Sequence, residues 1–160
     1  LDGVIQQLLT LSLSNISADQ VALLLLQGEE LKLCGRAFSN EPGVQLGKLL
    51  PTSAEHELAL GIANYVARTD EKLVLEDATR DTRFVADRYI RAHGPKSVAA
   101  LPLLLRGHLL GVLYLENSAV SCAFSATHIE LAQLLCFQAG MAIEHIRLYE
   151  KLNERPASSS

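Results

Sequence analysis

Apolar residues recur along this chain with two different periods, and these periods predict a mixed succession of helices and strands. Residues 2–16 place apolar side chains at close to helical spacing, which predicts an amphipathic helix. Residues 21–26 are short and continuously apolar, as expected of a buried strand, and Gly28-Glu29 then turns the chain into a second strand over 31–35. Proline and glycine interrupt residues 39–51 and predict a loop there.

The middle of the chain is less regular. Thr52 and Glu55 form a capping-box pattern that predicts the start of a helix over 53–68, followed by a short strand at 73–75. Residues 77–95 are irregular and charged, with a short helical stretch near 83–92 that Gly94-Pro95 ends.

Two strands and a long helix are predicted to close the chain. The strands SVAALPLLL and HLLGVLYLEN are joined by a tight turn at Arg106-Gly107. Ser125 or Thr127 begins a helix that reaches about Asn153, with Glu130 as the capping partner of Thr127.

The stretch GVLYLEN, residues 111–117, indicates how these elements are layered. Successive side chains of a strand point to opposite faces of its sheet, and here both faces stay mainly apolar until Glu116. Both faces therefore need a cover. We expect an α+β arrangement in which the terminal helices cover one face, and helix 53–68 with the segment 77–95 covers the other. An irregular cover packs less densely, so we expect a cavity on that second side.

Composition narrows the class of function. The 160 residues are 49% hydrophobic, enough for one packed domain, which we place at 1–153 with a flexible tail or linker at 154–160. The net charge of −4 argues against nucleic acid and against direct contact with an anionic membrane. Cys34, Cys122 and Cys136 form neither a disulfide framework nor a zinc motif, which favours a reducing, cytoplasmic compartment. No run is long and apolar enough for a membrane span, although a parent protein could carry an anchor.

Three stretches of the chain resemble one family. SVAALPLLLRGHLLGVLYLEN is similar to the two central strands of GAF domains, above all those of bacterial sensor kinases. LVLEDATRDTRFVADRYI resembles the segment that covers their pocket, and FSATHIELAQLLCFQAGMAIEHIRLYEKL resembles their closing helix. The resemblance spans nearly the whole chain and implies a GAF-like (profilin-like) fold and a regulatory module of a histidine or serine/threonine kinase rather than an enzyme.

The resemblance also implies a small-molecule ligand between the sheet and the covering segment. GAF ligands vary, and no cofactor is indicated for this chain. This chain lacks the lysine that follows Asn117 in the signature of cyclic-nucleotide GAF domains. Its covering segment also lacks the cysteine that bilin-binding relatives carry. His93 is the nearest candidate for a haem ligand. We expect no catalytic residue and no metal-ligand set. The candidate ligand-binding residues, with the face that meets the cavity taken from the family, are Asp77, Phe84, Arg88, Tyr89, Val98, Ala100, Tyr114 and Glu116.

Each candidate also has an ordinary structural explanation. The alternative for Glu116 is a solvated strand end that caps or forms a salt bridge, and the alternative for Tyr114 is a core residue whose hydroxyl needs a partner. An arginine fork such as that of Arg88 suits a carboxylate or phosphate, but alternating charges on a short helix usually form surface pairs. Phe84 and Tyr89 form the apolar inner side of the covering segment.

The last helix carries more apolar residues than one sheet needs to cover it. Its apolar residues spread over more than one face: Leu131, Leu134, Leu135, Met141, Ile143, Ile146, Leu148, Tyr149 and Leu152. A helix that covers only its own sheet needs one apolar stripe, so a second apolar surface is expected to pair with another chain beside residues 4–13. The leading hypothesis is thus a ligand-sensing homodimer. A ligand-free dimerisation spacer is the alternative, and a thiol-dependent reductase is a third hypothesis.

Overall fold

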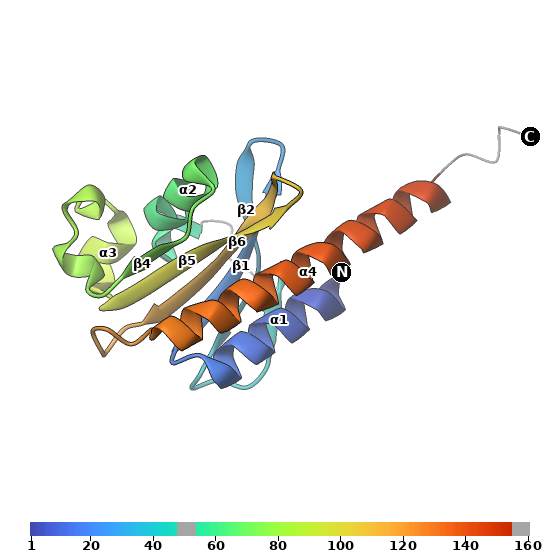
Figure 1. Cartoon of the computed structure of the whole chain (residues 1–160). Coiled ribbons are helices and arrows are strands. Elements are labelled where there is room, and N and C mark those ends of the chain that lie inside the picture. The colour runs from blue at the N-terminus through green and yellow to red at the C-terminus, as the bar shows by residue number, and fades with distance from the viewer. Residues whose placement is uncertain (48–53, 155–160) are drawn as a thin grey trace, which may run out of the picture.

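A six-stranded antiparallel sheet lies at the centre of the molecule, in a computed structural model that describes residues 1–47 and 54–154 (Figure 1). The strand order is β3-β2-β1-β6-β5-β4. The strands are β1 Gln20–Gln27, β2 Glu30–Phe38, β3 Val44–Leu46, β4 Leu73–Leu75, β5 Ser97–Leu105 and β6 His108–Asn117. The helices are α1 Asp2–Asn15, α2 Leu60–Thr69, α3 Arg88–His93 and α4 Ala126–Asn153, with short 3-10 turns η2 Ala54–His56, η3 Ala78–Arg80 and η4 Thr82–Phe84.

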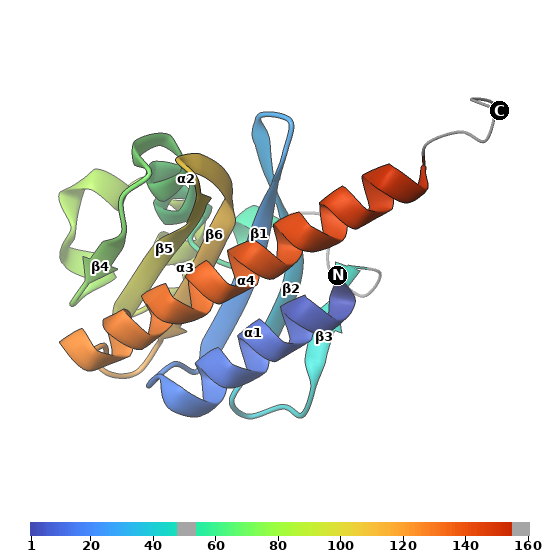
Figure 2. The same ribbon diagram turned by 45° about the vertical axis from the view of Figure 1, so that its right-hand side comes forward.

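The helices form two layers on opposite faces of this sheet. The terminal helices α1 and α4 lie side by side on one face, while α2, α3 and the turns between them lie on the other (Figures 1 and 2). The α+β arrangement and the placing of the helices expected from the sequence are therefore confirmed.

Strand alternation divides the core in two. Leu23, Leu101 and Leu113 face α1 and α4, whereas Leu24 and Val112 face α2 and α3. All five are almost fully buried, because every central strand is covered on both sides. The continuous apolar run of β1 follows directly from this double cover.

Two predicted boundaries differ from the structure. The predicted loop 39–51 contains the three-residue strand β3, which pairs with β2 at its edge. The predicted helix over 53–68 begins only at Leu60, because the backbone just before it is held by the sheet layer: the Ala59 N–H donates to the Tyr114 hydroxyl, and the Glu57 carbonyl accepts from Gln20. The predicted cap at Thr52 lies outside the described residues.

The long helix α4 begins after Ser125, one of the two predicted cap residues, but its capping partner differs from the expected one. Ser125 is the N-cap, and it exchanges two hydrogen bonds with His128, from the His128 N–H to Ser125 Oγ at 3.1 Å and from the Ser125 N–H to His128 Nδ1 at 3.2 Å. A neutral imidazole nitrogen accepts as a carboxylate would, so His128 completes the box in place of Glu130.

The C-terminal part of α4 extends beyond the sheet (Figure 2). Ile143 is the last residue of this helix that its own chain buries, while the helix continues to Asn153. Its final turns therefore lack any cover from the described part of the chain.

Candidate functional site

A buried polar cluster lies beneath α3, at the end of strand β6. Glu116 is only 2% exposed. Its carboxylate accepts a hydrogen bond from the Tyr114 hydroxyl at 2.6 Å and another from the Tyr89 hydroxyl at 2.8 Å. Tyr114 belongs to the same strand and Tyr89 to α3, so the carboxylate links the sheet to the segment that covers it.

Two backbone contacts orient this cluster. The Ala59 N–H donates to the Tyr114 hydroxyl at 3.2 Å, so the hydroxyl proton is directed to Glu116. The Gln20 amide nitrogen donates to the Glu57 carbonyl at 3.0 Å, which leaves Gln20 Oε1 facing the Tyr89 hydroxyl at 3.3 Å. The acceptor oxygens of Glu116 and Gln20 thus converge on one hydroxyl group.

Burial sets the electrostatics of the cluster. Burial raises the pKa of Glu116, and the hydrogen bonds from the two tyrosines oppose that rise. Burial, and after it the Glu116 charge, raises the pKa of Tyr89 and holds that of Tyr114 well above its usual range. Both tyrosines therefore remain protonated donors at neutral pH.

The sheet beneath the cluster is apolar and closed. Val98 and Ala100 on β5 pair with Glu116 and Tyr114 on β6, and Val98, Ala100 and Tyr114 are 0% exposed. They pack in one cluster with α2 residues such as Ile62. The structure therefore brings four of the sequence-predicted site residues together on the predicted face.

The covering segment contributes Phe84 and Tyr89 to the same cluster. Phe84 is 6% exposed and meets Tyr65 of α2 edge-on, with the ring centroids 5.8 Å apart. The Tyr89 ring lies 4.6 Å from that of His93, which is exposed and belongs to the same helix. Six of the eight predicted residues thus form one contiguous group under the covering segment.

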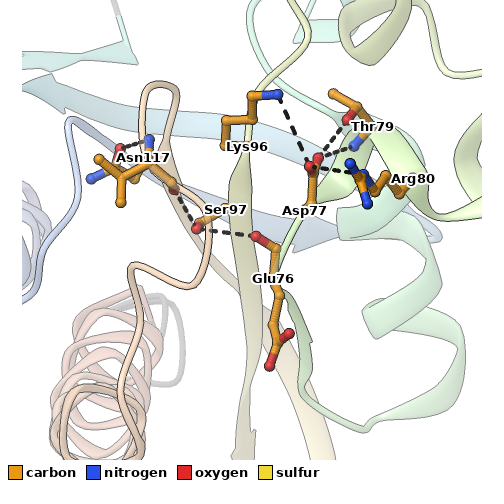
Figure 3. Close-up of polar contacts among 8 residues, drawn as sticks. Glu76, Asp77, Thr79, Arg80, Lys96, Ser97 and Asn117 are labelled. Atoms are coloured by element: carbon orange, nitrogen blue, oxygen red, sulfur yellow. Dashed lines mark hydrogen bonds and ion pairs between the residues drawn. The ribbon is translucent and has the colours of Figure 1, made fainter.

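Asp77 lies at the start of the covering segment and acts as its cap (Figure 3). Its carboxylate accepts hydrogen bonds from the Thr79 N–H and hydroxyl, and it pairs with Lys96 at 4.0 Å and Arg80 at 3.6 Å. The Thr79 hydroxyl, ahead of the two cations, lowers the pKa of Asp77. Asp77 is fully engaged in holding the first turn and is not part of the Glu116 cluster.

Arg88 points away from the cluster. Its side chain is 69% exposed and pairs with Glu55 at 3.6 Å. Arg83 likewise pairs with Asp81 at 2.7 Å on the surface. These arginines form the surface pairs that alternating charges usually make.

Two polar side chains that position the elements around the cluster were missed by the sequence reasoning. Asp87 accepts from the Ile90 N–H at 3.1 Å and from the Gly61 N–H at 2.8 Å, so one carboxylate caps α3 and holds the start of α2. A Cβ at Gly61 would lie 2.8 Å from that carboxylate. The Asp before Arg88 was a recognisable N-cap signal, but its second partner is a tertiary contact.

Ser97 is the other missed position. It is 1% exposed, donates to the Val120 carbonyl at 2.7 Å and accepts from the Ala123 N–H at 2.9 Å, and it also lies beside the Glu76 carbonyl (Figure 3). This hydroxyl fastens the loop between β6 and α4 to β5. A lone serine at the start of a strand carries no signal for that role.

None of the eight predicted residues lines any of five surface hollows in the described part of the chain. One of the five does lie on the side covered by α2, between Gly61 and the turn at Gly28, but away from the Glu116 cluster. One hollow of ≈ 680 Å³ lies between the end of β5 and α4, lined by Phe137 and Met141 among others. A second separates α1 from α4 near Leu11.

Thiols and metal ligands do not gather at the cluster. Cys34 and Cys136 pack with the α1 and α4 layer, on the opposite face of the sheet, and burial raises the pKa of Cys136 to about 12. Cys122 is exposed in the loop after β6.

Within residues 1–47 and 54–154, no group of three or more His, Cys, Asp or Glu side chains is placed to hold a metal ion. No helix in that same part of the chain has the length and apolar character required to cross a membrane.

The family model described as "GAF domain" matches residues 1–143 of this chain. The chain belongs to the GAF family. The family membership expected from the central strands and closing helix is confirmed, and with it the assignment to the regulatory domains of signalling proteins.

Curated relatives of this GAF domain are much longer proteins. It is 34% identical over 97 residues to hybrid signal transduction histidine kinase G of Dictyostelium discoideum, covering 61% of this chain and 3% of that protein. It is 27% identical over 157 residues to a probable 3',5'-cyclic phosphodiesterase, pde-5, of Caenorhabditis elegans, covering 95% of this chain and 21% of that protein.

Solved structures share the fold of this GAF domain. A GAF domain from Synechocystis sp. PCC6803 in its photoproduct state matches with a TM-score of 0.73 at 15% identity, covering 96% of this chain and 99% of that one. The GAF domain of a two-component sensor histidine kinase from Bacillus halodurans matches with a TM-score of 0.68 at 19% identity, covering 94% and 97%.

Proposed function

We propose that this GAF domain is a dimerising, small-molecule-sensing regulatory module, without catalysis of its own, in a cytoplasmic signal-transduction protein. The observation that carries the proposal is an apolar stripe along the exposed side of α4. A histidine or serine/threonine kinase is the proposed parent, supported by the kinases among the relatives.

The stripe has the spacing of a helix that pairs with a like helix. Leu134, Met141 and Leu148 are seven residues apart and 52%, 51% and 53% exposed. At 3.6 residues per turn, Phe137 and Leu152, which are also exposed, fall on the same side of α4. A seven-residue apolar repeat is the pattern of a two-helix coiled coil.

A second copy of this chain is the proposed occupant of the stripe. The stripe continues past Ile143 to Leu152, where α4 has already left its own sheet and covers nothing else among the described residues. A parallel two-fold pair would bury the same residues from both copies and would point both C-termini in one direction. A small shift of the paired helices would then transmit a signal.

The dimer is tested by sedimentation over a range of concentrations. We expect wild-type dimers and a shift to monomers in Met141→Asp/Leu148→Asp, because charges would be buried without partners. Val85→Asp, which alters a 59%-exposed apolar residue on the other layer, serves as the control and should leave the dimer intact. A wild-type chain that stays monomeric at high concentration would refute the dimer.

The sensing role rests on the cluster around Glu116. Its acceptor oxygens are buried, and the Tyr89 hydroxyl of the short covering segment contacts both Glu116 and Gln20. Native mass spectrometry of the protein purified from its own host should show a bound small molecule together with the subunit count. A ligand-free dimer would support the second candidate instead.

A ligand-free dimerisation spacer is that second candidate, and the full burial of Val98, Ala100 and Tyr114 favours it. The Ala100→Leu substitution distinguishes a ligand-free spacer from a ligand sensor. In a filled core this change should cost about 1–3 kcal/mol of the free energy of unfolding. If α3 opens readily to admit a ligand, the added methylene groups should cost less and should abolish ligand binding. Urea unfolding of both proteins measures the difference.

A further inference from the structure

We infer that the site under α3 accepts an organic cation, an ammonium or amidinium group on a ring-sized apolar body, and that the Tyr89 side chain now occupies its place. This inference deepens the proposed sensing function and rests on it. It follows from the hydrogen-bond capacity of the cluster and from the charges around it.

The cluster has more acceptors than donors. Glu116 Oε2 and Gln20 Oε1 both face the Tyr89 hydroxyl, at 2.8 and 3.3 Å. A phenol has one hydrogen and can donate fully to only one of the two. The Gln20 amide group cannot turn to compensate without giving up its 3.0 Å bond to the Glu57 carbonyl. An ammonium group has three hydrogens and an amidinium group four, so either would satisfy both oxygens at once.

The charges around the cluster also select a cation. Among the residues that the structure describes, no lysine or arginine lies within ion-pair distance of Glu116. Asp19 acts on Glu116 as a second negative charge, and Glu57 near Tyr89 is already paired with Arg36 at 2.5 Å. A carboxylate or phosphate ligand would meet the like charges of Glu116 and Asp19 here, whereas a cation would supply the missing partner of a buried acid.

The Tyr89 side chain covers these two oxygens. Tyr89 is 8% exposed, and its ring stacks on the exposed ring of His93. Its other neighbours are the apolar residues of the α2 and α3 layer. Withdrawal of Tyr89 would leave a ring-sized apolar space with two acceptors at its end, which defines the shape of the ligand.

The test uses three probes of equal size and different charge: benzylamine, benzyl alcohol and benzoate. They are titrated into Tyr89→Ala, which vacates the ring, and binding is followed by ligand-observed and protein NMR. We expect the dissociation constant of benzylamine to be at least about ten-fold lower than that of benzyl alcohol, and we expect benzoate not to bind. In Tyr89→Ala/Glu116→Gln the preference for the amine should disappear, while Tyr89→Ala/Glu130→Gln, which alters an exposed α4 carboxylate, should retain it.

Each other outcome overturns the inference. Equal binding of the three probes, tighter binding of benzoate, an amine preference that survives Glu116→Gln, or no binding to a folded Tyr89→Ala protein would each refute the cationic class. If Tyr89→Ala does not fold, the same probes are titrated into the wild type and Glu116→Gln, where the same ranking and the same loss are expected at lower affinity. A neutral or anionic ligand found by native mass spectrometry would refute the cationic class and leave the sensing proposal standing.

Discussion

The two faces of the sheet are covered in different ways. On one face, two long helices bury a continuous apolar core that includes Leu9, Leu113 and Ile143. On the other, a ten-residue helix, a six-residue helix and single turns bury a second apolar core that includes Ile62 and Val66. The short covering segment is also joined by hydrogen bonds, from Tyr89 to Glu116 and from the Gly61 N–H to Asp87. A short helix or a single turn buries less apolar surface than a long helix does, and a few hydrogen bonds can be broken one at a time. The first layer should therefore unfold only with the whole domain, and the second should open locally.

The largest effect is expected from Leu9→Ala on the side of the terminal helices. Leu9 is 0% exposed, and its truncation should lower the free energy of unfolding by about 2–5 kcal/mol. Leu11→Ala on the same helix, at a 36%-exposed position, is the matched control and should cost far less. Urea denaturation followed by circular dichroism compares them, and similar losses would contradict the division of the helix into buried and exposed sides.

Tyr89→Phe should act locally on the other side. The variant keeps the ring and removes the hydrogen bond to Glu116, which should cost about 1–3 kcal/mol. Amide hydrogen exchange should accelerate in α3 and the turns before it, and much less in α1 and α4. Tyr65→Phe removes only a weak surface contact with Arg83 at 3.5 Å and should leave exchange unchanged. Uniform acceleration across both layers would show that the two are not separable.

The pH dependence of stability should report Glu116. Its pKa is raised above 4.5 in the folded protein, so its contribution to stability is full below 4.5 and is lost as the pH rises through the folded-state pKa. Over that window the wild type should lose stability relative to Glu116→Gln by at most about 1.4 kcal/mol for each pH unit. The pKa of Asp77 is lowered from 3.8, so its contribution to stability is present above pH 3.8 and is lost as the pH falls below that value. This dependence is opposite to that of Glu116. Urea midpoints measured from pH 4 upward test this, and curves that run parallel would contradict it.

The smallest effect is expected from Asp87→Ala. Loss of the α3 cap and of the contact with the Gly61 N–H should cost about 1 kcal/mol. Exchange at Gly61 and Ile90 should rise together, because one carboxylate protects both amides. Asp81→Ala, which caps η4 within its own segment, is the control and should leave the amide of Gly61 protected.

Local patterns predicted most of the fold. The period-two and helical patterns placed every major strand and helix, because those periods reflect which side chains are buried. The start of α2 could not be read in this way, since the hydrogen bonds of Glu57 and Ala59 to β1 and β6 displace the beginning of the helix. The strand β3 was hidden because three residues carry too little periodicity.

The candidate site was also predicted in part from local patterns. Phe84, Tyr89, Val98, Ala100, Tyr114 and Glu116 lie together as the alternation of β5 and β6 and the family resemblance predicted. Asp77 and Arg88 lie apart from them, because Asp77 caps the first turn of the covering segment and Arg88 pairs with Glu55 on the surface. Whether those six residues contact a ligand stays a prediction.

The sequence by itself determined the family, the order of elements and the two-sided burial of the sheet, because these depend on residue type and spacing within short stretches of chain. Only the tertiary structure decided that Glu116 is a buried acceptor and not a solvated strand end. That outcome depends on Tyr89, 27 positions away in the chain, reaching the same carboxylate as Tyr114. Contacts between such distant residues leave no periodic trace in the sequence.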